Sequence, residues 1–288
     1  MPGQEYSKIA GILRAETTRV GWVVCHLMLV GCWIASAANS QSIVPDGGTA
    51  TTVTIGAEVQ EIVGIAPVQG PGVSHNTYSQ FSISPHGAVL DNTRAGAALI
   101  VNEVTSSAPS TIRGPLSVSG DAAHVVVANP NGVTVDGGRF VNTGNVALTT
   151  GSVAFDPVGR PVATITGGQV TIGEGGISGQ MAGLDLLAQR IRVTGSVSLD
   201  DTGGGDFSIT AGQNTVTFDD SSQILPFARV QSIGISGSDA VVVDITRSAA
   251  VSAGRIRVAV TEDGAGVHLA GANSAGAGGL PRNCFFLT

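Results

Sequence analysis

The chain has 288 residues, of which 12% are charged, 4% are aromatic and 42% are hydrophobic, and its formal net charge is −7. The charged share is about half of the ~25% usual in globular domains, but the hydrophobic content excludes an intrinsically disordered chain. The acidic balance argues against a nucleic-acid-binding protein, which needs basic patches.

The first 37 residues have the organisation of a secretory signal peptide. Its basic residues are Lys8, Arg14 and Arg19. An apolar run follows at 20–34, and small residues then predict cleavage at the bond between Ala37 and Ala38. The alternative is an uncleaved membrane anchor. That alternative is disfavoured because the run is shorter than the ~20 residues that span a bilayer and contains His26.

Cleavage would change the composition of the mature protein. The leader carries three basic and two acidic side chains, so its loss changes the net charge from −7 to −8. Both tryptophans and two of the three cysteines lie in the leader, which leaves Cys284. A secreted chain with one thiol has no internal disulfide framework, so its core must stabilise it.

From Ile43 to about Val267, short apolar segments alternate with Gly, Asn, Asp, Ser and Thr. Examples are Val125–Val127, Val153–Phe155, Val162–Ile165 and Val216–Phe218. Such short, evenly spaced segments predict an all-β fold. A sandwich or barrel prefers longer alternating strands in antiparallel pairs. Strands of three to five residues, with corners nearly as long, favour a parallel β-helix.

One segment fits this rhythm poorly. Residues 181–190, MAGLDLLAQR, contain good helix formers and could form a short helix. Alternating apolar and polar residues follow directly, so we predict strand structure over 184–193.

A tight corner is predicted directly after the apolar segment 125–127, at Asn129-Pro130-Asn131-Gly132. Pro130 presets φ for the first central position of a turn, and Asn131 or Gly132 can adopt a positive φ. By itself the motif predicts only a surface turn that reverses the chain.

The longer stretch ANPNGVTVDGGRFVNTGNVALTTG, residues 128–151, resembles the amino-terminal secretion domain of filamentous haemagglutinin and other two-partner secretion (TPS) exoproteins of Gram-negative bacteria. The matching residues are Asn129, Pro130, Gly132, Val133, Asp136, Gly137, Phe140, Val141, Asn142, Leu148, Thr149, Thr150 and Gly151.

Further blocks match the same family in the same order. The earlier ones, GVSHNTYSQFSI and IVNEVT, contribute Ser74, His75, Asn76, Tyr78, Phe81, Asn102 and Glu103. The later ones are similar at 183–198 and 253–271. We therefore expect a TPS domain at 38–271 and a flexible Gly/Ala-rich tail at 272–288, which could be the boundary to a missing exoprotein region.

The resemblance implies a right-handed parallel β-helix with an N-terminal cap. It also implies recognition in the periplasm by the POTRA domains of a dedicated outer-membrane transporter of the TpsB type. Export through that transporter, without nucleotide hydrolysis, would place the protein at the cell surface or outside the cell. One departure is that DNTRAGAALIVNEV lacks the Asn-Pro-x-Leu turn of many members, which puts a second corner contact in doubt.

Two other classes of function compete with this assignment. An enzyme is disfavoured because the nearest acidic cluster, Asp200-Asp201 with Asp206, lacks a calcium-binding repeat, and the histidines lack metal-ligand spacing. We therefore expect no catalytic residue, metal or cofactor. A stand-alone adhesin or glycan-binding protein is the stronger alternative, although the mature chain offers one tyrosine, Tyr78, as a sugar-stacking ring. In the family, host-cell or glycan binding and toxin activity belong to regions beyond this domain.

Overall fold

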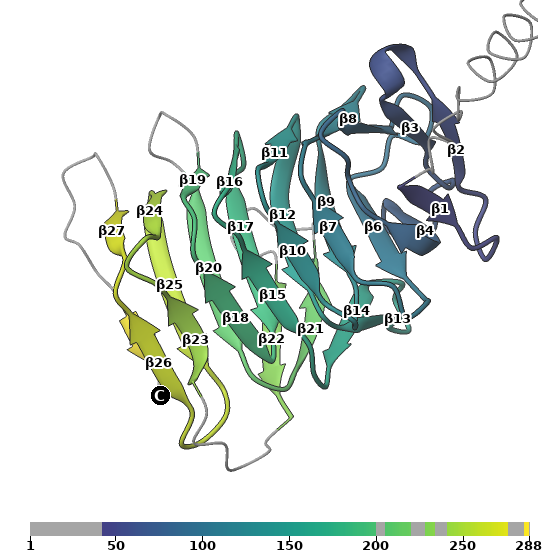
Figure 1. Ribbon diagram of the computed structural model, residues 1–288. Helices are drawn as coiled ribbons and strands as arrows, with labels where there is room; N and C mark the ends of the chain where they lie inside the picture. The colour runs from purple at the N-terminus through teal and green to yellow at the C-terminus, as the bar shows by residue number, and fades with distance from the viewer. Residues whose placement is uncertain (1–41, 200–204, 220–227, 234–240, 276–284, 288) are drawn as a thin grey trace, which may run out of the picture. The chain divides into compact units, whose positions relative to one another are not determined.

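The computed structural model describes residues 42–199, 205–219, 228–233, 241–275 and 285–287 (Figure 1). The predicted leader, its cleavage site and most of the predicted tail lie outside the described residues. Within these ranges the chain forms strands joined by turns and loops, together with one 3-10 turn, η1 (Ala57–Val59). No helix of the described residues is long and apolar enough to cross a membrane.

Three sheets of stacked strands make up the body of the domain, and successive coils add one strand to each sheet in turn (Figure 1). Sheet 1 contains β1 (Ile43–Pro45), β4 (Val73–Phe81), β6 (Leu99–Val104), β9 (Ala123–Ala128), β12 (Thr143–Thr149), β17 (Gly183–Ala188), β20 (Asp206–Ala211), β25 (Arg255–Val260) and β28 (Phe285–Leu287). Sheet 2 contains β2 (Thr52–Ile55), β3 (Glu61–Gly64), β5 (Ala88–Asp91), β8 (Pro115–Ser119), β11 (Gly138–Val141), β16 (Ile177–Gly179), β19 (Val197–Leu199), β24 (Ala250–Ala253) and β27 (Ala272–Ala275). Sheet 3 contains β7 (Ser110–Ile112), β10 (Val133–Val135), β15 (Gln169–Ile172), β18 (Arg190–Val193), β23 (Val241–Ile245) and β26 (Gly266–Leu269).

Parallel pairing between coils confirms the predicted β-helix. In sheet 1, Val125 pairs with Val146, which pairs with Leu184, and the column continues through Phe207 and Ile256. All five side chains belong to the main apolar core. Since side chains alternate between the two faces of a strand, a fixed register places apolar residues of successive coils above one another.

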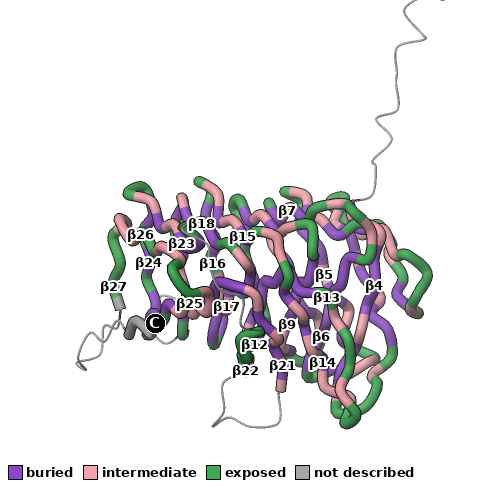
Figure 2. Tube along the Cα trace, turned by 90° about the horizontal axis from the view of Figure 1, so that it is seen from below, coloured by how far each residue is buried: buried purple, intermediate pink, exposed green. Residues whose placement is uncertain are grey.

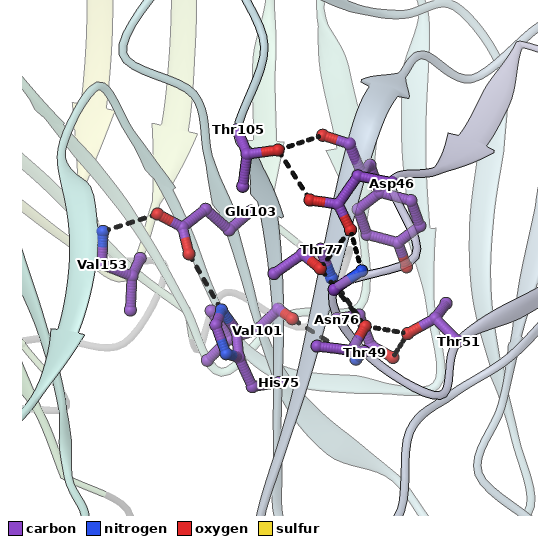
Figure 3. A network of polar contacts seen from close by, with 12 residues as sticks. Asp46, Thr49, Thr51, His75, Asn76, Thr77, Val101, Glu103, Thr105 and Val153 are labelled. Atoms are coloured by element: carbon purple, nitrogen blue, oxygen red, sulfur yellow. Dashed lines mark hydrogen bonds and ion pairs between the residues drawn. The ribbon is translucent and has the colours of Figure 1, made fainter.

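The N-terminal end of the stack is closed by antiparallel strands. β1 pairs antiparallel with β4, and β2 pairs antiparallel with β3. The Asp46 carboxylate, which directly follows β1, accepts hydrogen bonds from the hydroxyls of Thr77 at 2.6 Å and Thr105 at 2.7 Å (Figure 3). Burial acts to raise the pKa of Asp46, but these hydrogen bonds outweigh it and hold the pKa below its usual value. The cap is therefore tied to β4 and to the residue that directly follows β6.

A fourth, antiparallel sheet lies outside the helix, and we call it the outer sheet. Two excursions from the coils build it, in the order β13 (Ser152–Phe155), β14 (Pro161–Ile165), β21 (Asn214–Phe218) and β22 (Ala228–Ser232). Figure 2 shows β14 and β21 beside β6, β9 and β12. Its inner side chains pack with outward-facing residues of sheet 1 in a second apolar cluster that includes Val101, Val126, Ala163 and Val216.

The outer sheet is where the sequence pattern is least informative. Val153–Phe155, Val162–Ile165 and Val216–Phe218 repeat the rhythm of the coils, yet they form antiparallel strands outside them. The strand prediction for 184–193 is confirmed, because β17 and β18 cover it except for Gln189. Buried leucines on sheet 1 outweigh the helix propensity of this segment.

Candidate functional site

The Asn129-Pro130-Asn131-Gly132 corner joins the end of β9 to the start of β10. The Gly132 N–H donates to the Asn129 carbonyl oxygen at 3.0 Å, which closes the turn, and the Asn131 N–H donates to Asn129 Oδ1 at 2.9 Å. Gly132 has φ +112°, a conformation that side-chain-bearing residues avoid. The predicted tight turn is confirmed, and its positive φ falls on Gly132 rather than Asn131.

Asn129 connects this corner to the preceding coil. Its side chain is fully buried, and Nδ2 donates to the Ala108 carbonyl oxygen at 2.8 Å and to Ser110 Oγ at 2.9 Å. Asn131 makes a parallel contact, since its Nδ2 donates to the Ser106 carbonyl oxygen at 2.7 Å. The partners Ser106, Ala108 and Ser110 carry no recognisable motif, so the sequence did not single them out.

The same corner is also bonded to the following coil. The Asn129 N–H donates to the Thr149 carbonyl oxygen at 2.9 Å. Thr149 Oγ1 in turn accepts the Gly151 N–H at 3.0 Å, and Thr150 Oγ1 donates to the Gly167 carbonyl oxygen at 2.6 Å. Thr149-Thr150-Gly151 is the point where the chain leaves the helix for β13, and Gly167 is where it returns. Thr150 therefore ties the exit to the return, while Thr149 stabilises the exit turn itself.

Exposure divides the corner into two parts. Asn129 is buried, whereas Pro130 and Asn131 are exposed and Gly132 is half-buried. In the folded domain, only the central residues of the turn are well placed to contact another molecule. Asn129 acts inside the protein.

A second group of motif residues lies at the capped end of the stack. Asn76 is fully buried, and its Oδ1 accepts from Thr51 Oγ1 at 2.8 Å (Figure 3). The same oxygen accepts the Ala66 N–H at 2.8 Å. Its Nδ2 donates to the Val101 carbonyl oxygen of the next coil at 3.3 Å. Ser74 Oγ donates to the Ala66 carbonyl oxygen at 2.6 Å. These contacts fix the turn before β4 against two coils.

Asn102 repeats the arrangement one coil further on. Asn76 and Asn102 are paired in register, and Asn102 Nδ2 donates to the Val126 carbonyl oxygen at 3.3 Å. Its Oδ1 accepts the Tyr78 hydroxyl at 3.0 Å. Tyr78 is fully buried against Phe81, with ring centroids 4.8 Å apart, and burial raises the pKa of Tyr78 well above its ordinary value. Asn102, Tyr78 and Phe81 therefore stabilise the interior of the β-helix.

A third group of motif residues lies on or beside the strands of sheet 2. Asp136 Oδ1 accepts the Gly175 N–H of the next coil at 2.7 Å, and Gly137 has φ +91°. Phe140 is fully buried. Asn142, at φ +56°, reaches back through Nδ2 to carbonyl oxygens of the previous coil at 2.8 and 3.0 Å.

The corner that lacks the Asn-Pro-x-Leu turn is still held by an asparagine. Asn92 Oδ1 accepts the Ala97 N–H at 2.7 Å, and its Nδ2 donates to the carbonyl oxygens of Ala97 and Asp121, each at 3.0 Å. Asn92 is buried. Its side chain therefore makes the corner contact that the missing Asn-Pro-x-Leu turn makes in many members.

These side chains hydrogen-bond mainly to backbone groups of the protein itself. The asparagine and threonine side chains are directed at carbonyl oxygens and N–H groups of neighbouring coils. Across the described ranges, no group of three or more His, Cys, Asp or Glu side chains is arranged to hold a metal ion. The arrangement builds a coiled scaffold, and at the Asn-Pro-Asn-Gly corner it leaves Pro130 and Asn131 exposed.

Comparison with known proteins gives consistent matches. The family model described as "TPS secretion domain" matches residues 41–280. The crystal structure of the filamentous hemagglutinin secretion domain superimposes with a TM-score of 0.71 and 31% identity, covering 82% of this chain and 84% of that one. The toxin CdiA of Yersinia pestis is 31% identical over 283 residues, covering 88% of this chain and 8% of that protein. Filamentous hemagglutinin of Bordetella pertussis is 34% identical over 191 residues, covering 60% of this chain and 5% of that protein. The chain thus spans less than a tenth of these curated relatives.

Proposed function

This chain belongs to the TPS secretion domain family, and we propose that it directs a two-partner secretion exoprotein of a Gram-negative bacterium to its outer-membrane transporter. A TPS domain implies a transporter of the TpsB type as partner. We further propose that the POTRA domains of this transporter bind the chain in the periplasm. The names of the relatives, such as toxin and hemagglutinin, describe much longer proteins, and we assign the export step alone to this domain.

The Asn-Pro-Asn-Gly corner is the motif on which this proposal can be tested residue by residue. One observation separates the roles of its residues. Asn129 is buried and bonded to Ala108 and Ser110, while Pro130 and Asn131 are exposed. Asn129 therefore serves the fold, and a transporter that contacts the folded corner would meet Pro130 and Asn131.

The experiment compares export with refolding for Pro130→Ala, Asn131→Ala and Asn129→Ala in cells that carry the partner transporter. Loss of export with unchanged refolding for the first two variants would support direct contact. Equal loss of export and refolding for all three would assign the whole motif to the fold. Asn92→Ala, which removes a buried corner asparagine outside the Asn-Pro-Asn-Gly motif, is the matched control for Asn129→Ala.

Folding outside the cell is the proposed source of free energy for export. Each added coil buries apolar side chains, as in the column from Val125 to Ile256, and apolar burial contributes roughly 25 cal/mol per Å². Coils stack on their neighbours, so folding can propagate as the chain emerges. A slow-folding core variant such as Phe140→Ala should be exported more slowly. Normal export of that variant would contradict this mechanism.

We propose that residues 1–37 are the signal peptide that brings the chain to the periplasm. Mass spectrometry of the culture supernatant, with and without the partner transporter, tests both steps. We expect a mature product that begins near Ala38 and appears outside the cell when the transporter is present. Export without the transporter, or glycan binding by the purified domain, would favour the stand-alone adhesin.

A further inference from the structure

The outer sheet is joined to the helix by an acidic side chain of the Asn-Glu-Val block. Glu103 lies on β6, two residues after Val101 and on the same outward face of the strand. Its Oε2 lies 2.9 Å from His75 Nε2, and its Oε1 accepts the Val153 N–H at 2.8 Å (Figure 3). Glu103 is buried, so both of its oxygens have partners where little water reaches them.

Val153 belongs to an edge strand of the outer sheet. β13 stands at the end of the order β13-β14-β21-β22, with Val153 opposite Ala163 of β14. An edge strand exposes N–H groups that can pair with another chain. Here the carboxylate of Glu103 occupies the Val153 N–H and ties the strand to sheet 1.

His75 supports the same strand from β4. Its ring meets the Phe155 ring edge-on, with centroids 5.1 Å apart at 63°. His75 and Glu103 therefore act on two alternate residues of β13, one through an aromatic contact and the other through a hydrogen bond. Below them, Val73, Leu99 and Val101 supply an apolar layer. Apolar packing is non-directional, whereas the carboxylate bond selects one register for β13.

We propose that Glu103 and His75 form a latch that fixes the outer sheet on the helix, and that the latch closes after the coil with the Asn-Pro-Asn-Gly corner is complete. Glu103 and Val153 are 50 residues apart, and the strands of that coil, β10, β11 and β12, lie between them. β13 leaves the helix at Thr149-Thr150-Gly151, whose Thr149 carbonyl oxygen accepts the Asn129 N–H. The position of Val153 therefore depends on the corner.

Hydrogen exchange of the folded full-length chain, followed by mass spectrometry, tests the latch. Local opening of a segment is reported by the exchange of its own amides. A hydrogen bond to a charged group contributes about 1.5–3 kcal/mol, so Glu103→Ala should speed exchange across 152–165 on the order of ten-fold or more. Amides of β9 and β17 should keep their rates. Glu103→Gln retains an acceptor for the Val153 N–H and should give a smaller increase, which keeps the test usable if Glu103→Ala does not fold.

Glu174→Ala is the matched control, because Glu174 is an exposed glutamate on a corner. It should leave exchange at 152–165 unchanged. Unchanged exchange at 152–165 in both Glu103 variants, or an equal increase in every strand, would overturn the latch. Pulse labelling during refolding tests the order: protection at 152–165 should arrive with or after protection of β12. Earlier protection of 152–165 would contradict the proposed order of closure.

Discussion

Asn129 Nδ2 lies 2.8 Å from the carbonyl oxygen of Ala108, so the best-matched corner motif of the chain is fixed by a residue of the preceding coil. Ser110 Oγ accepts a second bond from the same nitrogen at 2.9 Å. Asn129 and Ser110 are both buried, so removal of the Asn129 side chain leaves Ser110 Oγ without this donor where little water reaches it.

We expect Asn129→Ala to lower the free energy of unfolding by about 2–3 kcal/mol, since it removes two hydrogen bonds and leaves the buried Ser110 Oγ without this donor. Asn131→Ala should cost about 1 kcal/mol or less, because the exposed Ser106 contact can be replaced by water. Urea unfolding of the two variants measures both values. Equal losses would show that burial does not separate the two asparagines.

Gly168 lies where the chain returns to the helix, directly against the corner. A Cβ at this position would stand 2.8 Å from the Pro130 carbonyl oxygen and 2.8 Å from Thr150 Cβ, at φ +82°. Gly47 has nearly the same φ, +83°, but open space around it. Gly47→Ala should therefore cost about 1 kcal/mol from backbone strain, and Gly168→Ala about 1–3 kcal/mol more from overpacking. Similar midpoints of thermal unfolding for the two variants would contradict this prediction.

The Tyr78 hydroxyl supplies the hydrogen bond that Asn102 Oδ1 accepts inside the core. Tyr78→Phe keeps the ring against Phe81 but leaves the Asn102 oxygen without this donor. We expect a loss of about 1–3 kcal/mol in the free energy of unfolding. The double variant Tyr78→Phe/Asn102→Leu replaces both polar partners. In the Tyr78→Phe background, Asn102→Leu should lower the free energy of unfolding by less than it does in the parent protein. Additive costs in this double-mutant cycle would rule out the coupling.

Asp185, on β17, should make stability depend on pH. Burial raises its pKa to about 7, against an ordinary value of 3.8, although the Ser208 hydroxyl and the Arg257 charge on neighbouring strands oppose the shift. The nearby Asp206 adds to it. The folded state therefore binds more protons than the unfolded state between these values, and stability falls as pH rises from 3.8 to about 7.

Asp185→Asn removes this titration. Below pH 3.8, we expect the stabilities of the variant and the parent to depend on pH in the same way. Between pH 3.8 and about 7, the variant should gain stability relative to the parent. Above that range, the difference should stay constant. Urea midpoints measured from pH 3.5 to 8 give the difference directly, and the other titrating groups cancel in it. Parallel curves across this range would contradict the assignment.

Much of the fold could be predicted because its determinants are local. Three-residue apolar segments such as Val133–Val135 become strands since their inward residues recur at strand spacing, and the Asn129–Gly132 turn follows from the preferences of its own residues. Several motifs, matched in the same order along the chain, identified the family, and membership of the family implies the parallel β-helix. Local chemistry therefore determined the strands, the corners and the class of fold.

Tertiary structure decided which segments meet. The separation of Asn129 from Ser110 is 19 residues and that of Glu103 from Val153 is 50, and the chain has no fixed repeat from which such distances follow. The strand β13 has the same apolar rhythm as a coil strand, but it lies outside the helix, because the apolar outer face of sheet 1 needs a cover. Burial of that face is a property of the assembled coils, so no single segment encodes it.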